Sequence, residues 1–168
     1  MVSLGGRRET LRNGGKMRVN TKIFGEVDIA DDKISEFAGG IIGFPELRQF
    51  ALIHDEERGI NAGIRWMQSI QEPGFAMPVM DPLLVKPDYN PEVEDELLKD
   101  LDGLDAENLL VLVTATIPSD LTKMTVNLRG PIIINSLTRK ACQVIVEGDD
   151  YAVKFPIYEI LRAGKAGE

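Results

Sequence analysis

Apolar and polar residues alternate along most of this chain with a period of two, the pattern of a β-strand with one buried face. The alternation is clearest from Arg18, where Val19 and Thr21 share one side, and Val27 and Ile29 resume it after a glycine-containing turn. This segment therefore predicts a β-hairpin. Further short strands are expected within residues 33–37, 47–53, 64–69, 75–79, 83–85, 141–146 and 151–155. Pro78 predicts an edge strand or a bulge, because proline cannot donate to a β-ladder.

The longest apolar run is Leu109–Ile117, which is short, rich in β-branched residues and bounded by turn residues. These features favour a strand buried on both faces. Pro118-Ser119-Asp120 then predicts a reversal, after which residues 124–135 are expected to pair back with the first run. The rest of the chain is expected to add strands around this pair.

One helix is predicted at about residues 90–102, with Asn90 as N-cap, Pro91 in the first turn, an apolar stripe and an acidic opposite face. With about ten short strands beside it, the expected fold class is mainly β, a small closed or nearly closed β-barrel. Residues 17–160 are expected to form this single domain, and residues 161–168 a frayed tail. Residues 1–16 have few large aliphatic side chains, so they are expected to be a disordered extension. Codons for Gly14-Gly15 can form a ribosome-binding site, which leads to the hypothesis that translation starts at Met17.

The composition excludes some classes of function but does not identify the function. A chain of 168 residues with 43% hydrophobic residues is an ordinary globular protein, and no apolar run has the length of a membrane-spanning helix. The single cysteine suits a reducing compartment, so we expect a cytoplasmic protein with no membrane partner. A net charge of −8 disfavours direct nucleic-acid binding and either attracts a basic partner or keeps the domain in solution.

Residues with catalytic potential are few, so neither an enzyme nor a cofactor is expected. His54 and Asp55 are adjacent, but no nucleophile elbow accompanies them, and Cys142 has apolar neighbours. Metal-binding spacings are absent from the sequence. Two alternatives stay open, a carboxylate-based hydrolase and a small-molecule-binding barrel with an open apolar interior.

Three blocks of sequence resemble the FliW family, the bacterial flagellar assembly factors. They are Gly40-Ile41-Ile42-Gly43-Phe44-Pro45 with Phe50-Ala51-Leu52, then Trp66-Met67-Gln68-Ser69 with residues 73–82, and finally residues 124–135. The blocks occur in the same order as in the family, and the resemblance covers roughly residues 17–160. Arg129-Gly130 and Ala141 depart from the usual family residues, which have Ala and Gly near these positions.

The resemblance implies a small barrel-like, non-catalytic regulator with two protein partners. One is CsrA, an RNA-binding translational repressor that FliW-like proteins prevent from silencing flagellin messenger RNA. The other is flagellin, which competes with CsrA for the same regulator. The resemblance also implies that CsrA is antagonised outside its RNA-binding surface, and we expect the free regulator to be a monomer.

A partner surface is expected where apolar tips are rimmed by charge. The candidate residues are Ile41, Ile42 and Phe44 in the glycine-rich loop, together with Met77, Asp81 and Pro82. Asn127 and Asn135 each close an apolar run, where they either tie the backbone at a strand end or contact a partner.

Overall fold

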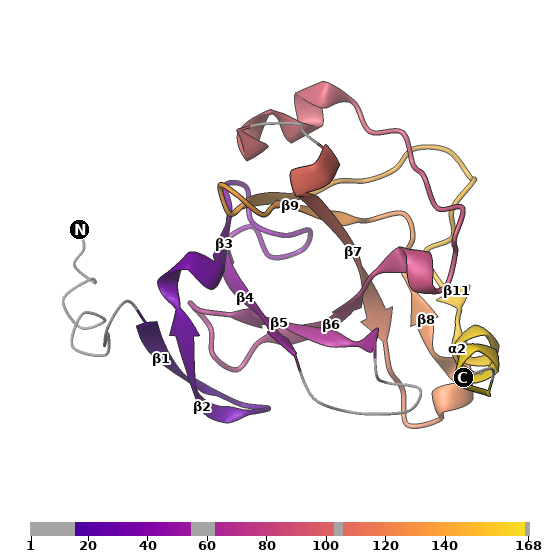
Figure 1. The fold of residues 1–168 in the computed structure, drawn as a ribbon, viewed down its shortest axis with the longest axis horizontal. Coiled ribbons are helices and arrows are strands. Elements are labelled where there is room, and N and C mark those ends of the chain that lie inside the picture. The colour runs from indigo at the N-terminus through magenta and orange to yellow at the C-terminus, as the bar shows by residue number, and fades with distance from the viewer. Residues whose placement is uncertain (1–15, 55–62, 103–105, 167–168) are drawn as a thin grey trace.

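Seven strands close into a β-barrel, as expected (Figure 1). The computed structural model describes residues 16–54, 63–102 and 106–166. Six of the seven pairings around the ring are antiparallel, and the parallel pairing of β10 with β3 completes it. In order around the barrel the strands are β3 (Ile34–Phe37), β4 (Gln49–His54), β5 (Arg65–Ser69), β6 (Ala76–Met80), β7 (Leu109–Thr116), β9 (Ile132–Asn135) and β10 (Lys140–Gln143).

The barrel interior is filled with side chains. Every barrel strand contributes at least one residue to a single buried cluster, and Ile41 and Leu47 join it from the connection between β3 and β4. The strand contributions are Phe37, Phe50, Met67, Val79, Leu112, Ile132, Ile134 and Ala141. A packed interior argues against the alternative of a small-molecule-binding barrel, which needs an open one.

The predicted N-terminal hairpin is present beside the barrel. It consists of β1 (Lys16–Thr21) and β2 (Gly25–Ala30), and its Val19 and Ile29 pack against Ala51 of β4. Lys16, expected in the extension, is the first residue of β1, while residues 1–15 lie outside the described residues. The hairpin thus widens the core by covering one outer face of the barrel (Figure 1).

Strand β7 organises the other side of the molecule, and the predicted reversal after it is confirmed. Its first half pairs with β9 and its end pairs with β8 (Thr125–Val126), which in turn pairs with β11 (Phe155–Pro156). The strand predicted over residues 151–155 is thus confined to its last residue and Pro156.

The tail predicted to fray is instead an α-helix, α2 (Tyr158–Ala166). Leu161 donates its backbone N–H to Ile157 O over 3.0 Å and packs against a second buried cluster, which includes Met124, Val126 and Ile157. The apolar residues Ile157 and Leu161 are four positions apart, so they share one face of the helical turn that covers this cluster.

The acidic helix predicted at residues 90–102 is also corrected. The structure has a 3₁₀ helix, η4 (Asp95–Leu101), and Glu94 before it is extended, with φ −66° and ψ 141°. Asn90 does not cap a helix, because residues 91–94 are not helical, and its backbone N–H donates to the Tyr151 hydroxyl over 3.1 Å. The apolar stripe still has a partner, since Leu98 and Leu101 pack against Ile133 and Val144 on the outside of the barrel.

A strand was expected at residues 83–85, and a 3₁₀ turn, η3 (Pro82–Leu84), is found there. Asp81 caps this turn by accepting the Leu83 N–H over 2.9 Å. Among the helices of the described ranges, none combines the length and apolar character required to cross a bilayer. The other 3₁₀ turns are η1 (Asp31–Lys33), η5 (Ala106–Asn108) and η6 (Leu121–Lys123).

Candidate partner-binding surface

Two prolines limit the ladder between β6 and β7. Extending the register of this ladder places Pro78 opposite Ala115, next to the paired residues, and Pro82 opposite Val111, two positions past Met80. A prolyl nitrogen carries no hydrogen, so neither residue can extend the pairing. The prediction of an edge strand at Pro78 was wrong, because β6 lies between β5 and β7, but the proline does end one ladder. The two remaining pairs are Val79–Thr114 and Met80–Val113.

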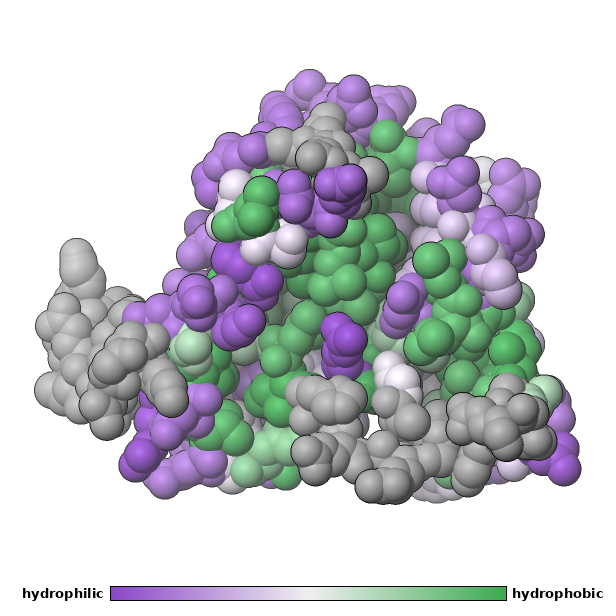
Figure 2. Space-filling view, viewed as in Figure 1, coloured by the Kyte–Doolittle hydropathy of each residue, from purple (hydrophilic) through white to green (hydrophobic). Residues whose placement is uncertain are grey.

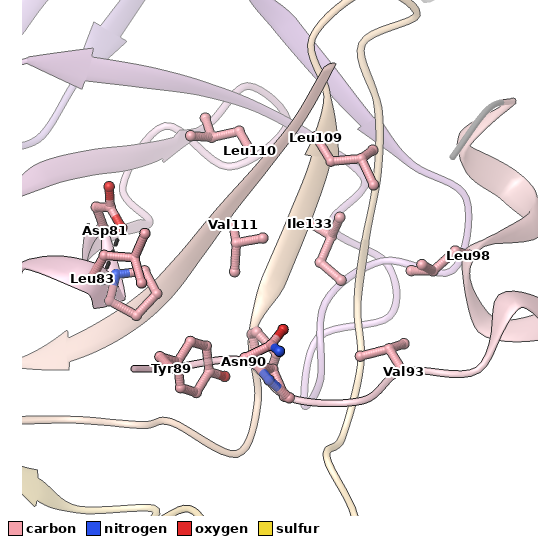
Figure 3. A pocket seen from close by; sticks show the side chains of 13 residues that line it. Asp81, Leu83, Tyr89, Asn90, Val93, Leu98, Leu109, Leu110, Val111 and Ile133 are labelled. Atoms are coloured by element: carbon pink, nitrogen blue, oxygen red, sulfur yellow. Dashed lines mark hydrogen bonds between the residues drawn. The ribbon is translucent and has the colours of Figure 1, made fainter. Parts of the chain in front are cut away.

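An apolar groove of about 430 Å³ opens where β6 stops pairing with β7. Figure 3 shows Asp81 and Leu83 on one side of β7, and Val93 and Leu98 on the other. Figure 2 shows apolar residues gathered over β7 in the middle of this face, with hydrophilic residues above them. The walls of the groove are mainly Leu83, Val93, Leu98, Leu109, Val111 and Ile133.

An acidic hollow adjoins this groove and shares Val93 with it. Glu92, Glu94 and Glu147 line the hollow, and all three are exposed. Asp81 and Asn90 are the polar residues of the apolar groove, and no Lys or Arg of the described residues lines either depression. The electrostatic field at both openings therefore favours a cationic group.

The glycine-rich loop forms a tight turn whose apolar tip points outward. Ile41 and Phe44 exchange two backbone hydrogen bonds of 3.3 and 2.9 Å, and Gly43 between them has φ +90°. Ile41 is 3% exposed and fills the barrel, whereas Ile42 is 50% and Phe44 42% exposed. The turn thus has a buried anchor and an exposed apolar tip.

Aromatic contacts hold this tip against the barrel. The ring of Phe44 meets Phe75 edge-on at 4.9 Å between centroids, and Phe75 meets Phe50 at 6.2 Å. On the other side of the turn, the Ile42 N–H donates to Gln143 Oε1 over 2.9 Å, and Gln143 Nε2 donates to Gly130 O. These contacts fix the orientation of Ile42 and Phe44 before any partner arrives.

The eight predicted surface residues lie in different settings. Phe44 contacts Phe75, and both Phe75 and Met77 pack against the barrel cluster, while Asp81 and Pro82 line the groove. Ile41 and Pro82 are buried. Gln143 and the exposed Leu83 and Leu84 were not predicted, because nothing in their local pattern separates them from ordinary strand residues.

Both asparagines hydrogen-bond to the backbone near a strand end, as expected if their role is to tie the backbone there. Asn127 Oδ1 accepts the Arg129 N–H over 2.9 Å, at the break between β8 and β9. Asn135 is 4% exposed, donates to Leu101 O over 2.9 Å and accepts the Leu137 and Thr138 N–H groups. Asn135 therefore joins η4 to the end of β9 from within the fold.

Residues 18–157 match the model of a family described as FliW protein. The chain belongs to the FliW family. The flagellar assembly factor FliW of Lachnospira eligens is 46% identical over 147 residues, which are 87% of this chain and 97% of that protein. Its counterpart in Lachnoclostridium phytofermentans is 45% identical over 143 residues, or 85% of this chain and 92% of that protein.

The fold agrees with this family as well. A crystal structure of a flagellar assembly factor FliW superposes with a TM-score of 0.77 at 28% identity, covering 83% of this chain and 96% of that one. Membership of the FliW family thus assigns the chain to the flagellar assembly factors, whose name describes assembly and no chemical reaction.

For this FliW family member, the described residues offer little chemistry. Within them, no group of three or more His, Cys, Asp or Glu side chains is placed to hold a metal ion. The His54 side chain and Asp55 lie outside the described residues, so their pairing stays a sequence hypothesis. Burial, with a smaller contribution from Asp100, raises the pKa of the Cys142 thiol to about 11.

Cys142 is therefore expected to react slowly with electrophiles. At pH 8, alkylation by iodoacetamide should be about a hundredfold slower in the folded protein than in urea, because the thiolate fraction changes tenfold per pH unit. The folded-state rate should rise steadily as the pH approaches 11. Mass spectrometry of timed samples measures both rates, and equal rates in the two states would contradict a raised pKa of the half-buried thiol.

Proposed function

We propose that this FliW family member is a flagellar assembly factor that acts in the cytoplasm by binding proteins and catalyses nothing. Its two partners are the translational repressor CsrA and flagellin, which bind in competition. While flagellin is abundant inside the cell it occupies the regulator, and its export frees the regulator to remove CsrA from flagellin messenger RNA. The free protein is a monomer.

The observation that carries this proposal is the exposed apolar tip at Ile42 and Phe44. Apolar side chains held outward by a rigid turn gain binding energy without losing conformational freedom on association. Phe44 is exposed, and an aromatic side chain that a partner can bury is the kind of residue that dominates protein interfaces. Together with Met77 and Asp81, this tip supports a protein-docking role better than a chemical one.

The acidic surface of the protein supports the proposal that one partner is basic. An RNA-binding repressor carries positive charge, so the net charge of −8 should speed its encounter with this chain. The same charge fits a protein that does not bind nucleic acid itself. The proposed contact with CsrA lies outside its RNA-binding surface, as the resemblance to the family implies. Stopped-flow association rates with CsrA should fall as salt rises, and rates independent of salt would contradict electrostatic attraction.

Replacing Phe44 with alanine is expected to weaken binding of CsrA and flagellin by about tenfold or more, because the anchoring ring is lost. Asp81→Ala should weaken binding less, since a rim charge mainly affects association. Isothermal titration calorimetry with each purified partner measures both effects. Leu137→Ala is the matched control, because Leu137 is an exposed apolar residue in the turn between β9 and β10. If Phe44→Ala and Asp81→Ala both bound CsrA and flagellin as tightly as the parent protein, this surface would be refuted.

A further inference from the structure

The first half of β7 has one edge that no other strand of the described residues occupies. Thr114 O accepts the Asn127 N–H, and Asn108 O, just before β7, accepts the Ser136 N–H. The backbone N–H and C=O groups of the even-numbered residues of β7 therefore point toward β8 and β9. Backbone groups alternate along a strand, which turns those of Leu109 and Val111 toward β6. There the ladder has already stopped, because Pro82 stands in register with Val111 and the chain turns into η3.

Leu109 and Val111 thus present two N–H and two C=O groups at an open sheet edge. Both residues are only partly buried, and both line the apolar groove. Most protein sheets cover or charge such an edge, because it is a template for pairing with another chain. Here the edge opens into a groove that no described segment fills.

The two faces of this edge are both apolar. The side chains of Leu109 and Val111 lie on the outer face with Leu98 and Ile133, whereas Leu110 packs toward the barrel cluster. A strand added beside β7 would direct alternate side chains to these two faces. Three successive apolar residues of such a strand would therefore find apolar surface, and the flanking residues would leave the groove near exposed acidic side chains.

The surroundings of the groove are acidic. The exposed Asp81 lies on one side of β7 and Val93 on the other (Figure 3). Glu92 and Glu94, the exposed neighbours of Val93 in the sequence, line the adjoining hollow. We propose that the β7 edge and its groove form a strand-addition site for an extended peptide segment of three apolar residues flanked by Lys or Arg. Main-chain hydrogen bonds to Leu109 and Val111 supply binding, and the flanking cations supply selectivity.

The test uses a phage-displayed library of random dodecapeptides selected on the intact protein, without CsrA or flagellin. Enriched peptides should share an apolar triplet with flanking basic residues. A synthetic copy should bind at least about tenfold more weakly to Val93→Arg, which places a cation in the groove. Leu121→Arg in η6 is the control for an added cation elsewhere and should bind normally, with both variants keeping the parent melting temperature.

Amide hydrogen exchange followed by NMR provides the second measurement. Exchange of the Leu109 and Val111 N–H groups should slow at least about tenfold when the synthetic peptide is bound. Failure to enrich any peptide, equal binding by Val93→Arg, or unchanged exchange at these two amides would each overturn the site. Neither CsrA nor flagellin is used in this test. A negative result would therefore not bear on the proposed regulation, which is tested separately by calorimetric titration with those two partners.

Discussion

Replacing Gly40 with alanine is expected to lower the free energy of unfolding by about 2 to 5 kcal/mol, as a sum of backbone strain and overpacking. Gly40 has φ +72°, a left-handed conformation that residues with a side chain rarely adopt. A Cβ atom there would also press on the carbonyl oxygen of Pro45 and lie 2.6 Å from Pro45 Cα. Backbone cannot move aside as a flexible side chain can, so the turn carrying Ile42 and Phe44 must shift.

Two neighbouring glycines supply matched controls for Gly40. Gly39→Ala meets nothing within 4 Å and needs no positive φ, so its unfolding free energy should stay within about 0.5 kcal/mol of the parent. Gly43→Ala has φ +90° but open space, and should cost only the strain, about 1 to 2 kcal/mol. Urea unfolding ranks the three variants, and equal losses at positions 39 and 40 would contradict the close approach.

The second large effect is expected at Asn135. Asn135→Leu should lower the free energy of unfolding by about 2 to 4 kcal/mol, because it removes the acceptor for two backbone N–H groups in a poorly hydrated site. The groups left without this acceptor are those of Leu137 and Thr138, at 2.9 and 3.2 Å. Leu101 O would keep the hydroxyl of Thr138 as a donor, which limits the loss on that side.

Asn127→Leu is the control for Asn135→Leu. Its side chain accepts one backbone hydrogen bond at a half-buried position, so the expected loss is about 1 kcal/mol. Chemical denaturation of both variants measures the difference. If Asn135→Leu kept parent stability but lost partner binding, Asn135 would be a contact residue and the structural interpretation would be wrong.

Local pattern was sufficient to predict elements whose two strands are close in sequence. The β1–β2 hairpin follows from alternation around Gly25, and the reversal after β7 follows from Pro118 and Asp120. In both cases the turn chemistry and the apolar period point to the same structure. Closure of the barrel was expected from strand number alone, without the strand order that achieves it.

Tertiary contacts decided the elements that were predicted wrongly. The segment from Asn90 to Glu94 has the residues of a helix start, but the Tyr151 hydroxyl takes the Asn90 N–H, and Val93 packs as part of an extended chain. Such contacts override helix propensity, which is worth only a fraction of a kcal/mol per residue. The α2 helix was missed because its short charged sequence is stabilised mainly by packing of Leu161.

The candidate surface was only partly readable from sequence. The loop sequence marks Ile41, Ile42 and Phe44 alike, yet the turn directs Ile41 inward and the other two outward. The apolar groove could not be predicted from the sequence, because it lies between β7 and residues 89–98, which no local pattern places beside β7. The position of that segment depends on η4 and Tyr89. Tyr89 is fixed by donating its hydroxyl to Leu128 O over 2.6 Å, a contact between positions far apart in sequence.

The parallel pairing of β10 with β3 joins Lys140 to Glu36 and Ala141 to Phe37, so the ring is completed by segments separated by most of the chain. During synthesis on the ribosome, β3 through β7 can associate early, but β3 keeps an unoccupied border until β10 has emerged. Completion of the ring is therefore expected to be a late step, and contacts between such distant segments slow folding. Nascent chains arrested before residue 140 should accordingly be sensitive to proteases and prone to associate through β3.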